Sequence, residues 1–480
     1  MNRSNMPKAG FIDPSGNNAD AVHDLAEDVL DQLLEQLEGA EDRSPLPTDS
    51  TAPAVTIPES SQTHDDLLDD LETIVDGSMN PAHPGYIGHM DTMPTTVSVL
   101  GDLVASAVNN NMLSVEMSPV FSELEVQVTE TIAGEFDLGP DAGGVLTSGG
   151  SLANLHALSV ARNQTFDIHE GGLAGLDREP VLFASEVAHT SLQKAAMLLG
   201  LGTDAVVAVE TDDHSRMEPG SLAKAIKRTE RNGRAPFCVV ATAGTTTTGN
   251  IDPLPAIHDV ADDHDLWFHV DAAYGGALVF SDAEGDRLDG IEAADSVTFN
   301  PQKWCYVAKT CAMALFVDAD VLQEEFRIGA PYMRGDDAIP NLGEVSVQGT
   351  RRAEILKLWL TLQHLGRDGL EQLIDESYRL TATVRDRVLE HDALELASEP
   401  EMNIVCFRAA PEWCPPAERD DLNSRLQQVL LSEHDIFVSL PTYRDSRWLR
   451  VVLLNPFTGT ETIGRLFDGI DAFLNAEETE

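Results

Sequence analysis

Basic residues, and lysine above all, are scarce in this chain. Only 31 lysines and arginines stand against 81 aspartates and glutamates, so the formal net charge over 480 residues is -50. Such a charge repels nucleic acids and anionic membranes, and we expect neither as a partner. Because the acidic residues are spread among clear apolar runs, the sequence predicts a folded acidic protein and not a disordered acidic tail.

Cysteine is also rare, and the cysteines form no C-x-x-C pair and no Cys/His spacing typical of a metal site. The five are Cys238, Cys305, Cys311, Cys406 and Cys414. We interpret them as free thiols in a reducing compartment and expect no metal. The chain lacks any run of about 18 apolar residues, and its first residues have no apolar core of the signal-peptide kind. These absences predict a soluble, cytoplasmic protein.

The shortage of lysine has a second implication, because only seven of the 31 basic residues are lysine. The composition predicts a cytosolic protein of a halophile, adapted to a salt-filled cell. An ordinary acidic protein of a low-salt cell is the alternative. Molar salt shortens the screening length to about 3 Å, which removes most of the repulsion between surface carboxylates.

The length of 480 residues predicts two or three domains, because a single hydrophobic core seldom grows so large. We expect an N-terminal helical segment with a linker over residues 1–80, a large domain over 81–345 and a small domain over 346–480. Apolar residues on one face predict a helix over residues 18–39, which packs on the core or forms a dimer contact. A second helix is expected over residues 65–75, beyond a linker rich in Pro, Ser and Thr.

Short apolar runs alternate with helical stretches between residues 140 and 320. This pattern predicts an α/β domain with a mainly parallel sheet that helices cover on both faces. The runs are Val181–Ala184, Val206–Val209, Phe237–Ala241, Leu266–Val270, Val297–Phe299 and Ala312–Val317. Beyond residue 345 we expect long helices over residues 350–365 and 370–390 and short strands near residues 404–407 and 449–453, a pattern that predicts a separate α+β domain. Ligands of parallel sheets bind at the carboxyl ends of strands, so residues that follow these runs are candidates for a site.

Two charged residues follow such runs: Asp271, in the motif H-V-D-A-A-Y-G-G, and Lys303, in N-P-Q-K-W. A lysine that forms a Schiff base and a carboxylate that keeps a pyridine nitrogen protonated are the protein groups that pyridoxal 5'-phosphate (PLP) most requires. A strand-end aspartate is more often a cap, and a lysine is usually solvated. Lysine is rare here, however, and this one lies beside an apolar run and a tryptophan. The pair therefore predicts a PLP site.

Two further segments fit that site. Residues 143–154, G-G-V-L-T-S-G-G-S-L-A-N, form a glycine-rich turn at a helix start, where backbone N–H groups suit a phosphate. His189 follows another apolar run, and its imidazole can stack on the PLP ring and assist proton transfer. Glycine turns and strand-end histidines are usually structural. These two segments support a PLP site only because they precede Asp271 and Lys303 in the same sequence.

Taken together, T-S-G-G-S-x-A-N, the His189 segment, H-V-D-A-A-Y-G-G and N-P-Q-K-W resemble the group II amino-acid decarboxylases, such as glutamate and 2,4-diaminobutyrate decarboxylases. The likeness covers about residues 80–460. It implies the aspartate-aminotransferase-like fold, PLP-dependent transferase fold type I, and decarboxylation of an L-amino acid to an amine and CO2. It also implies a homodimer with its active sites at the subunit interface.

The resemblance also implies roles for residues at matching positions. Lys303 would carry the cofactor, Asp271 would pair with the pyridine nitrogen and His189 would stack on the ring, and these three would be catalytic. The implied cofactor-binding residues are Gly150, Ser151, His189, Thr246, Asp271, Ala273, Asn300 and Lys303.

Two departures from the family pattern bear on the chemistry. Gln302 stands where the family commonly has a histidine. The region Arg334–Thr350 has no tyrosine, although glutamate and aromatic decarboxylases carry a mobile-loop tyrosine there that protonates the substrate carbon. Either another acid such as His189 does this work or the outcome differs, which leaves transamination and aldehyde formation open. A non-catalytic PLP-binding homologue is a further alternative.

The substrate motifs point in two directions. N-N-N-M-L at residues 109–113 and Arg450, in L-R-V-V, are similar to glutamate and cysteine-sulfinate decarboxylases, in which this arginine meets the substrate α-carboxylate. His89, in Y-I-G-H-M, and I-P-N-L at residues 339–342 resemble the 2,4-diaminobutyrate and siderophore-type lysine decarboxylases. The expected substrate is therefore glutamate, 2,4-diaminobutyrate or a similar acidic or diamino acid, bound by His89 and Arg450.

The net charge of -50 generates a prediction for the whole molecule. Raising KCl from about 0.1 to 2 M should raise the melting temperature and the dimer fraction together, and both should saturate, because like charges beyond a Debye length cease to interact. Calorimetry and sedimentation measure the two quantities. A continued linear rise, or an equal gain from sucrose, would instead indicate preferential exclusion, and an unchanged melting temperature would contradict the prediction.

Overall fold

A computed structural model describes residues 9–47, 51–53, 55–166, 168–328 and 339–479. The chain divides into two compact units. The first comprises residues 1–88, 424–439 and 455–480, and the second comprises residues 89–423 and 440–454. The domain boundaries expected at residues 80 and 345 remain predictions.

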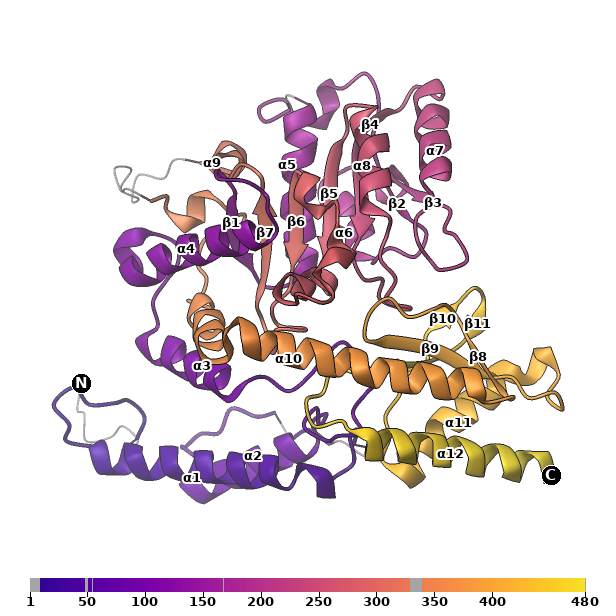
Figure 1. Cartoon of the computed structure of the whole chain (residues 1–480). Coiled ribbons are helices and arrows are strands. Elements are labelled where there is room, and N and C mark those ends of the chain that lie inside the picture. Colours follow the sequence, from indigo (N-terminus) through magenta and orange to yellow (C-terminus); the bar gives the residue numbers. More distant parts are fainter. Residues whose placement is uncertain (1–8, 48–50, 54, 167, 329–338, 480) are drawn as a thin grey trace. The chain divides into compact units, whose positions relative to one another are not determined.

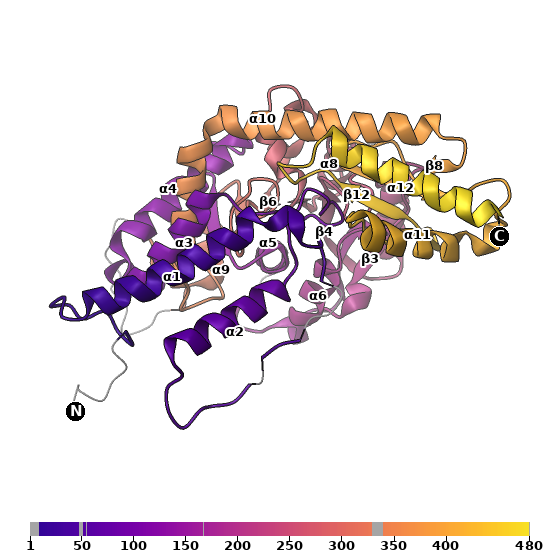
Figure 2. The same ribbon diagram turned by 90° about the horizontal axis from the view of Figure 1, so that it is seen from below.

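The first unit is helical. Its helices are α1 (Ala19–Glu38), α2 (His64–Asp76), α12 (Thr460–Thr479) and the later part of α11 (Arg419–His434). The predicted helices over residues 18–39 and 65–75 are confirmed, and α1 and α2 lie side by side (Figure 1, Figure 2). Helix α2 begins at a capping box, in which the side chains of Thr63 and Asp66 each accept the other's backbone N–H. The described part of the expected linker, residues 44–61, has no helix or strand.

The second unit contains a seven-stranded sheet, ordered β1-β7-β6-β5-β4-β2-β3 (Figure 1). Its strands are β1 (Gly143–Thr147), β2 (Pro180–Ser185), β3 (Val206–Val209), β4 (Ala235–Thr242), β5 (Trp267–Ala272), β6 (Ser296–Phe299) and β7 (Ala312–Phe316). Only β7 runs antiparallel to its neighbours. The sequence prediction of a mainly parallel sheet built from these six apolar runs is confirmed, and β1 is a seventh strand.

Helices cover both faces of this sheet, as the strand pattern requires. Leu182 and Ala184 of β2 pack against α5 and α6, whereas Val181 and Phe183 belong to the cluster that includes α7 and α8. Strands buried on both faces read as continuous apolar runs. The helices of this unit are α3 (Thr96–Val108), α4 (Pro119–Glu135), α5 (Gly150–Thr165), α6 (Ser191–Leu198), α7 (Pro219–Arg231), α8 (Leu254–Asp262), α9 (Asp320–Phe326) and α10 (Ile355–Glu390).

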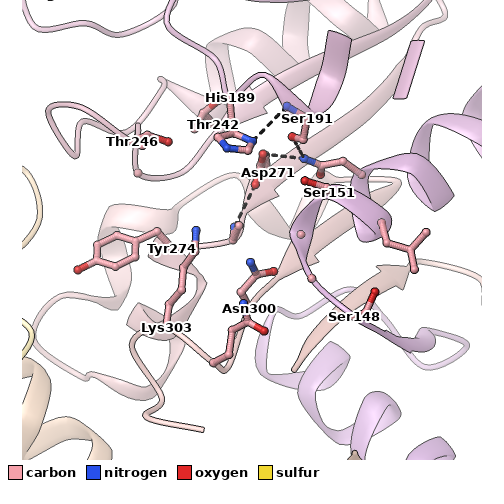
Figure 3. Close-up of a pocket in the computed structure, with 17 residues that line it drawn as sticks. Ser148, Ser151, His189, Ser191, Thr242, Thr246, Asp271, Tyr274, Asn300 and Lys303 are labelled. Atoms are coloured by element: carbon pink, nitrogen blue, oxygen red, sulfur yellow. Dashed lines mark hydrogen bonds between the residues drawn. The ribbon is translucent and has the colours of Figure 1, made fainter. Parts of the chain in front are cut away.

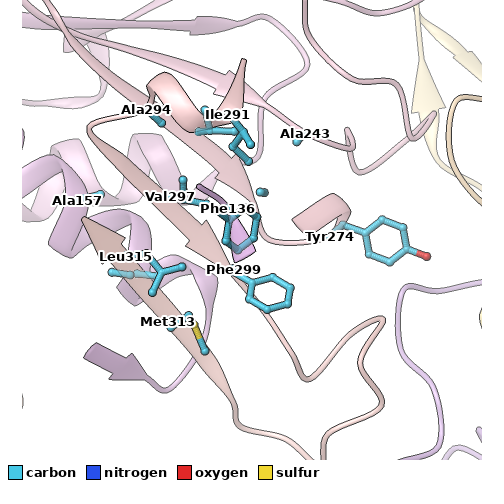
Figure 4. Packing of buried hydrophobic residues seen from close by; sticks show 14 of the residues in the cluster. Phe136, Ala157, Ala243, Tyr274, Ile291, Ala294, Val297, Phe299, Met313 and Leu315 are labelled. Atoms are coloured by element: carbon cyan, nitrogen blue, oxygen red, sulfur yellow. The ribbon is translucent and has the colours of Figure 1, made fainter. Parts of the chain in front are cut away.

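The main core extends along the large sheet and the helices packed on it, and within it Phe136, just after α4, contacts Phe299 of β6 edge to face, with ring centroids 5.6 Å apart (Figure 4). Two helices were expected over residues 350–365 and 370–390, and α10 consists of two helical parts that meet at a kink at Gly366, where the backbone is not helical and φ is 64°. The two expected helices are therefore confirmed. The kink position favours glycine, whose missing Cβ permits positive φ.

A smaller antiparallel sheet belongs to the same unit, with β9 (Ile404–Ala409) between β12 (Leu449–Val452) and β8 (Leu394–Leu396). A short hairpin pairs β10 (Thr442–Tyr443) with β11 (Ser446–Arg447). The strands expected near residues 404–407 and 449–453 are confirmed. Among the described residues, no helix is long and apolar enough to span a membrane. All five cysteines are buried free thiols.

The register of the parallel strands positions the residues at their carboxyl ends. Thr242 pairs with Asp271 across β4 and β5, and Asp271 pairs with Thr298 across β5 and β6. Side chains alternate along a strand, so aligned residues on neighbouring strands point to the same face. Asp271 therefore faces the same side of the sheet as Thr242 and Thr298.

Candidate active site

A cavity of about 380 Å³ opens at the carboxyl ends of these strands (Figure 3). Every residue expected to bind the cofactor lines it: Gly150, Ser151, His189, Thr246, Asp271, Ala273, Asn300 and Lys303. These residues are spread over more than 150 positions of the sequence. The fold therefore brings the candidate groups to a single place.

Asp271 is held by hydrogen bonds to both of its carboxylate oxygens. Asn154 Nδ2 donates to Oδ2 over 2.9 Å, and the backbone N–H of Ala273 donates to Oδ1 over 3.1 Å. The side chain is buried, with 6% exposed, and it borders the cavity. An ionised carboxylate only accepts hydrogen bonds, so the two donors fix its orientation and leave further lone pairs for a ligand.

Lys303 lies in the turn that follows β6, where its backbone N–H donates to the carbonyl of Asn300 over 3.0 Å. Burial lowers the pKa of its ammonium group, and the carboxylates of Asp271 and Asp91 oppose this shift. A lowered pKa increases the fraction of neutral amine, which is the nucleophilic form of lysine. The site can therefore supply an amine that reacts with an aldehyde.

The start of α5 and the side chain of Asn300 form the other end of the cavity. Helix α5 begins at Gly150 and directs its free backbone N–H groups and positive dipole end there. Asn300 is buried, and its Nδ2 group is a donor that a ligand at this end could accept from. A Cβ added at Gly150 would lie 2.8 Å from Asn300 Nδ2. This cradle of N–H donors, closed to larger side chains, fits a bound phosphate.

His189 lies between β2 and α6 and borders the cavity beside Asp271 (Figure 3). Its Nδ1 accepts the backbone N–H of Ser191 over 3.2 Å, so the neutral ring carries its proton on Nε2. Burial lowers the pKa of the imidazole, and the carboxylate of Asp271 opposes this shift. The ring therefore favours its neutral form at neutral pH.

The two expected substrate residues, His89 and Arg450, do not line this cavity, but they lie together behind its wall. Arg450 Nη2 is 3.3 Å from His89 Nδ1, and its Nη1 donates to the carbonyl of Thr246, which lines the cavity. Arg450 is buried, and burial lowers the pKa of its guanidinium. The pair places a buried cation one residue from the cavity.

Sequence reasoning missed several residues that line the cavity. They are Ser148, Asn154, Ser191, Thr242 and Tyr274. Asn154 lies within the quoted glycine motif, but no pattern links it to Asp271, which is 117 positions away. Tyr274 lies within the quoted motif H-V-D-A-A-Y-G-G, three residues after Asp271, and its ring stacks on Trp304 with centroids 5.2 Å apart. No role was expected for it, although its place in that motif is a local signal.

Gln302 also lines the cavity, and its Oε1 accepts the backbone N–H of Cys311 over 2.6 Å. Its side chain is therefore engaged by the start of β7. Part of the region Arg334–Thr350, in which a tyrosine is missing, lies outside the described residues.

Comparisons with known proteins agree with this geometry. Residues 47–410 match the family described as the pyridoxal-dependent decarboxylase conserved domain. Mouse cysteine sulfinic acid decarboxylase is 35% identical over 77% of this chain and 76% of its own length. The L-2,4-diaminobutyrate decarboxylase of Acinetobacter baumannii is 30% identical over 82% of this chain and 81% of its own. The crystal structure of mouse CSAD in apo form has a TM-score of 0.88 at 28% identity, and covers 95% of this chain and 99% of that one.

These findings define a PLP-dependent enzyme of fold type I. The chain belongs to the pyridoxal-dependent decarboxylase family, the group II decarboxylases, and is a carboxy-lyase whose cofactor is pyridoxal 5'-phosphate. The cavity fits that cofactor, because it joins an amine, a carboxylate and an N–H cradle. The substrate stays open, since the relatives act on different amino acids.

The close approach of Gly150 to Asn300 yields a prediction. Gly150→Ala should displace the Asn300 amide and weaken PLP binding about tenfold, or about 1.4 kcal/mol, while the apoprotein keeps its melting temperature. Fluorescence titration with PLP measures the affinity. Gly134→Ala on α4, where a Cβ meets nothing within 4 Å, is the matched control. Equal PLP affinity in the two variants would show that this end of the cavity does not hold the phosphate.

Proposed function

We propose that this protein is a PLP-dependent α-decarboxylase of L-amino acids that releases an amine and CO2, with glutamate, 2,4-diaminobutyrate or a similar acidic or diamino acid as substrate. The observation that carries the proposal is the convergence of Lys303, Asp271 and His189 on one cavity whose far end is the start of α5. Each group alone is common in proteins. Their joint placement suits one cofactor.

Each residue has a role in holding PLP. Lys303 is the point of covalent attachment, Asp271 accepts a hydrogen bond from the ring nitrogen, and His189 stacks on the ring. Bound PLP supplies an electron sink for the pair left when CO2 departs. Asp271 keeps the nitrogen protonated and so maintains that sink. The remaining contacts come from Ala273 at the ring, Thr246 near the cofactor, and Gly150, Ser151 and Asn300 at the phosphate.

His189 also returns a proton to the substrate α-carbon in the absence of a loop tyrosine. Its Nδ1 is engaged by the Ser191 N–H, so only Nε2 is left to exchange a proton with a ligand in the cavity. The proton on Nε2 of the neutral ring is therefore the one that His189 can offer to a ligand in the cavity. This supports His189 as the acid and not merely as a stacking group.

Arg450 and His89 bind the carboxylate end of the substrate. The guanidinium is buried and paired with His89, and it lies against the wall that Thr246 contributes. A buried cation at that position attracts an anionic group. Lys309 and Asp91 form an ion pair in the same unit, and both affect the pKa of Lys303, so charges of both signs lie near the reactive amine. Such a surrounding suits acidic and diamino acids alike.

The working form we propose is a cytoplasmic homodimer of a salt-adapted cell, with the active site at the subunit interface. Helix α3 supports a second copy, because apolar residues lie exposed along it: Val99, Leu100, Leu103, Val104 and Val108. Contiguous exposed apolar surface of this kind commonly marks a protein interface. The net charge of -50 explains why such a dimer would require salt.

Release of CO2 in 2 M KCl tests the proposal directly. The PLP-loaded protein should release CO2 from glutamate or 2,4-diaminobutyrate, and borohydride should fix PLP to the peptide that contains Lys303. Lys303→Ala should lose both properties, and Lys303→Arg should not restore them, because a guanidinium does not deprotonate.

Lys224→Ala, at an exposed lysine of α7, is the matched control and should behave as the parent protein. Covalent PLP in Lys303→Ala would contradict the assignment. Transfer of the amino group or formation of an aldehyde in place of CO2 and an amine would contradict the reaction.

A further inference from the structure

A series of hydrogen-bonded side chains runs from the half-buried Trp267 to the buried Asp271 behind the cavity. Trp267 Nε1 lies 2.9 Å from Ser296 Oγ, which lies 2.9 Å from His269 Nδ1. His269 Nε2 lies 3.1 Å from Asn154 Oδ1, and Asn154 Nδ2 donates to Asp271 Oδ2 over 2.9 Å. Ser296 and His269 are fully buried, and Asn154 is 1% exposed. A buried polar group without a hydrogen-bond partner destabilises the fold, so each proton in this series is expected to lie between a donor and an acceptor.

The two groups at the ends of this hydrogen-bonded series, the Trp267 indole and the Asp271 carboxylate, determine the direction of its hydrogen bonds. An indole N–H can only donate, and an ionised carboxylate can only accept. With its Nδ2 directed at Asp271, Asn154 presents its Oδ1 to His269, and that oxygen also accepts from Thr298 Oγ1 over 2.7 Å. His269 must then carry its proton on Nε2.

The remaining links follow from the chemistry of histidine. Burial lowers the pKa of His269 to about 4, so the ring is neutral at neutral pH and has a single N–H. Its Nδ1 is therefore an acceptor. The Ser296 hydroxyl accepts from Trp267 and donates its own proton to that nitrogen. Each hydrogen bond in the series from Trp267 thus points toward Asp271, while Asn154 Nδ2 also donates to Ser191 Oγ over 2.9 Å. Bonds aligned in one direction polarise one another.

The opposite tautomer has a partner too, which makes the arrangement testable. The Ser296 carbonyl lies 3.0 Å from His269 Nδ1 and would accept a proton there. His269 Nε2 would then face the Asn154 oxygen with a lone pair, and the amide would have to turn over. Its oxygen would meet Asp271 Oδ2, which is tolerable only if Asp271 is protonated. The tautomer of His269 and the charge of Asp271 are therefore linked.

We propose that His269 and Asn154 are positioning residues, which hold Asp271 ionised and oriented toward the ring nitrogen of PLP through this directed chain of hydrogen bonds. The inference rests on the proposed role of Asp271. It gives a role in the reaction to two buried residues that contact neither Lys303, where the cofactor is attached, nor the proposed substrate residues His89 and Arg450. Outer residues of this kind typically change activity by about 10- to 100-fold when they are removed.

The tautomer of His269 is the first test, because it requires no turnover. The holoenzyme is labelled with ¹⁵N-histidine and studied by NMR in molar KCl, and the His269 signals are those lost in His269→Gln. A proton on Nε2 is the expected result. A proton on Nδ1 would overturn the directed chain, whatever the activity.

Kinetics of matched variants are the second test. His269→Leu and Asn154→Leu should lower kcat about 10- to 100-fold with KM within about threefold, since the effect passes through Asp271 and not through the substrate. His269→Gln restores an N–H donor near the position of Nε2 and should recover most of that loss. Asn163→Leu, on the same helix but bonded to Glu325, controls for loss of an amide from α5.

Three results keep this inference separate from the proposed function. Wild-type protein without PLP on Lys303 would reject the function, while the tautomer is still measurable. PLP on Lys303 with His269 protonated at Nδ1 would reject only the directed chain. Leucine variants that keep kcat within about threefold, or a glutamine variant as impaired as the leucine variant, would show that His269 serves packing alone.

Discussion

The parallel pairing of β4, β5 and β6 is the constraint on which the candidate site depends. In the observed register Thr242, Asp271 and Thr298 are neighbours near the carboxyl ends of their strands, and their side chains face the same side of the sheet. A slip by one residue would turn Asp271 to the opposite face, because side chains alternate with a period of two. The buried side chains of the strands prevent such a slip, since they would lose their contacts with helices on both faces. Packing of the core thus determines where the carboxylate lies.

The electrostatics of the site are local, although the protein as a whole is strongly acidic. Lys303 lies among Asp271, Asp91, Arg450 and Lys309, and burial is the largest influence on its pKa. Groups in contact in a buried site are screened little by salt, whereas surface carboxylates more than a Debye length apart are screened almost entirely. The same molar salt that relieves repulsion over the surface therefore leaves the interactions around the cofactor intact. Stability and chemistry can respond to salt separately.

Much of the fold and the site could be predicted because the informative residues are local in sequence. Strands buried on both faces appear as apolar runs, and Asp271, His189 and Lys303 each follow such a run closely. Their meeting in one cavity then follows from the rule that carboxyl ends of parallel strands share an edge.

Other features had no local signal. Asn154 contacts Asp271, and Arg450 contacts His89, across long stretches of sequence. These pairs depend on how α5 lies against the sheet and on how β12 pairs with β9. The antiparallel direction of β7 also depends on its neighbours and not on its own residues. Long-range pairing of this kind is invisible to periodicity, which reports burial and not the partner.

The rate of CO2 release by Asp271→Asn tests the central claim most directly, because the amide keeps the shape of the carboxylate and removes only its charge. We expect a folded, PLP-bound protein whose kcat falls by several orders of magnitude, since a neutral amide does not hold the ring nitrogen protonated. A loss of less than about tenfold, equivalent to about 1.4 kcal/mol, would contradict the role assigned to Asp271.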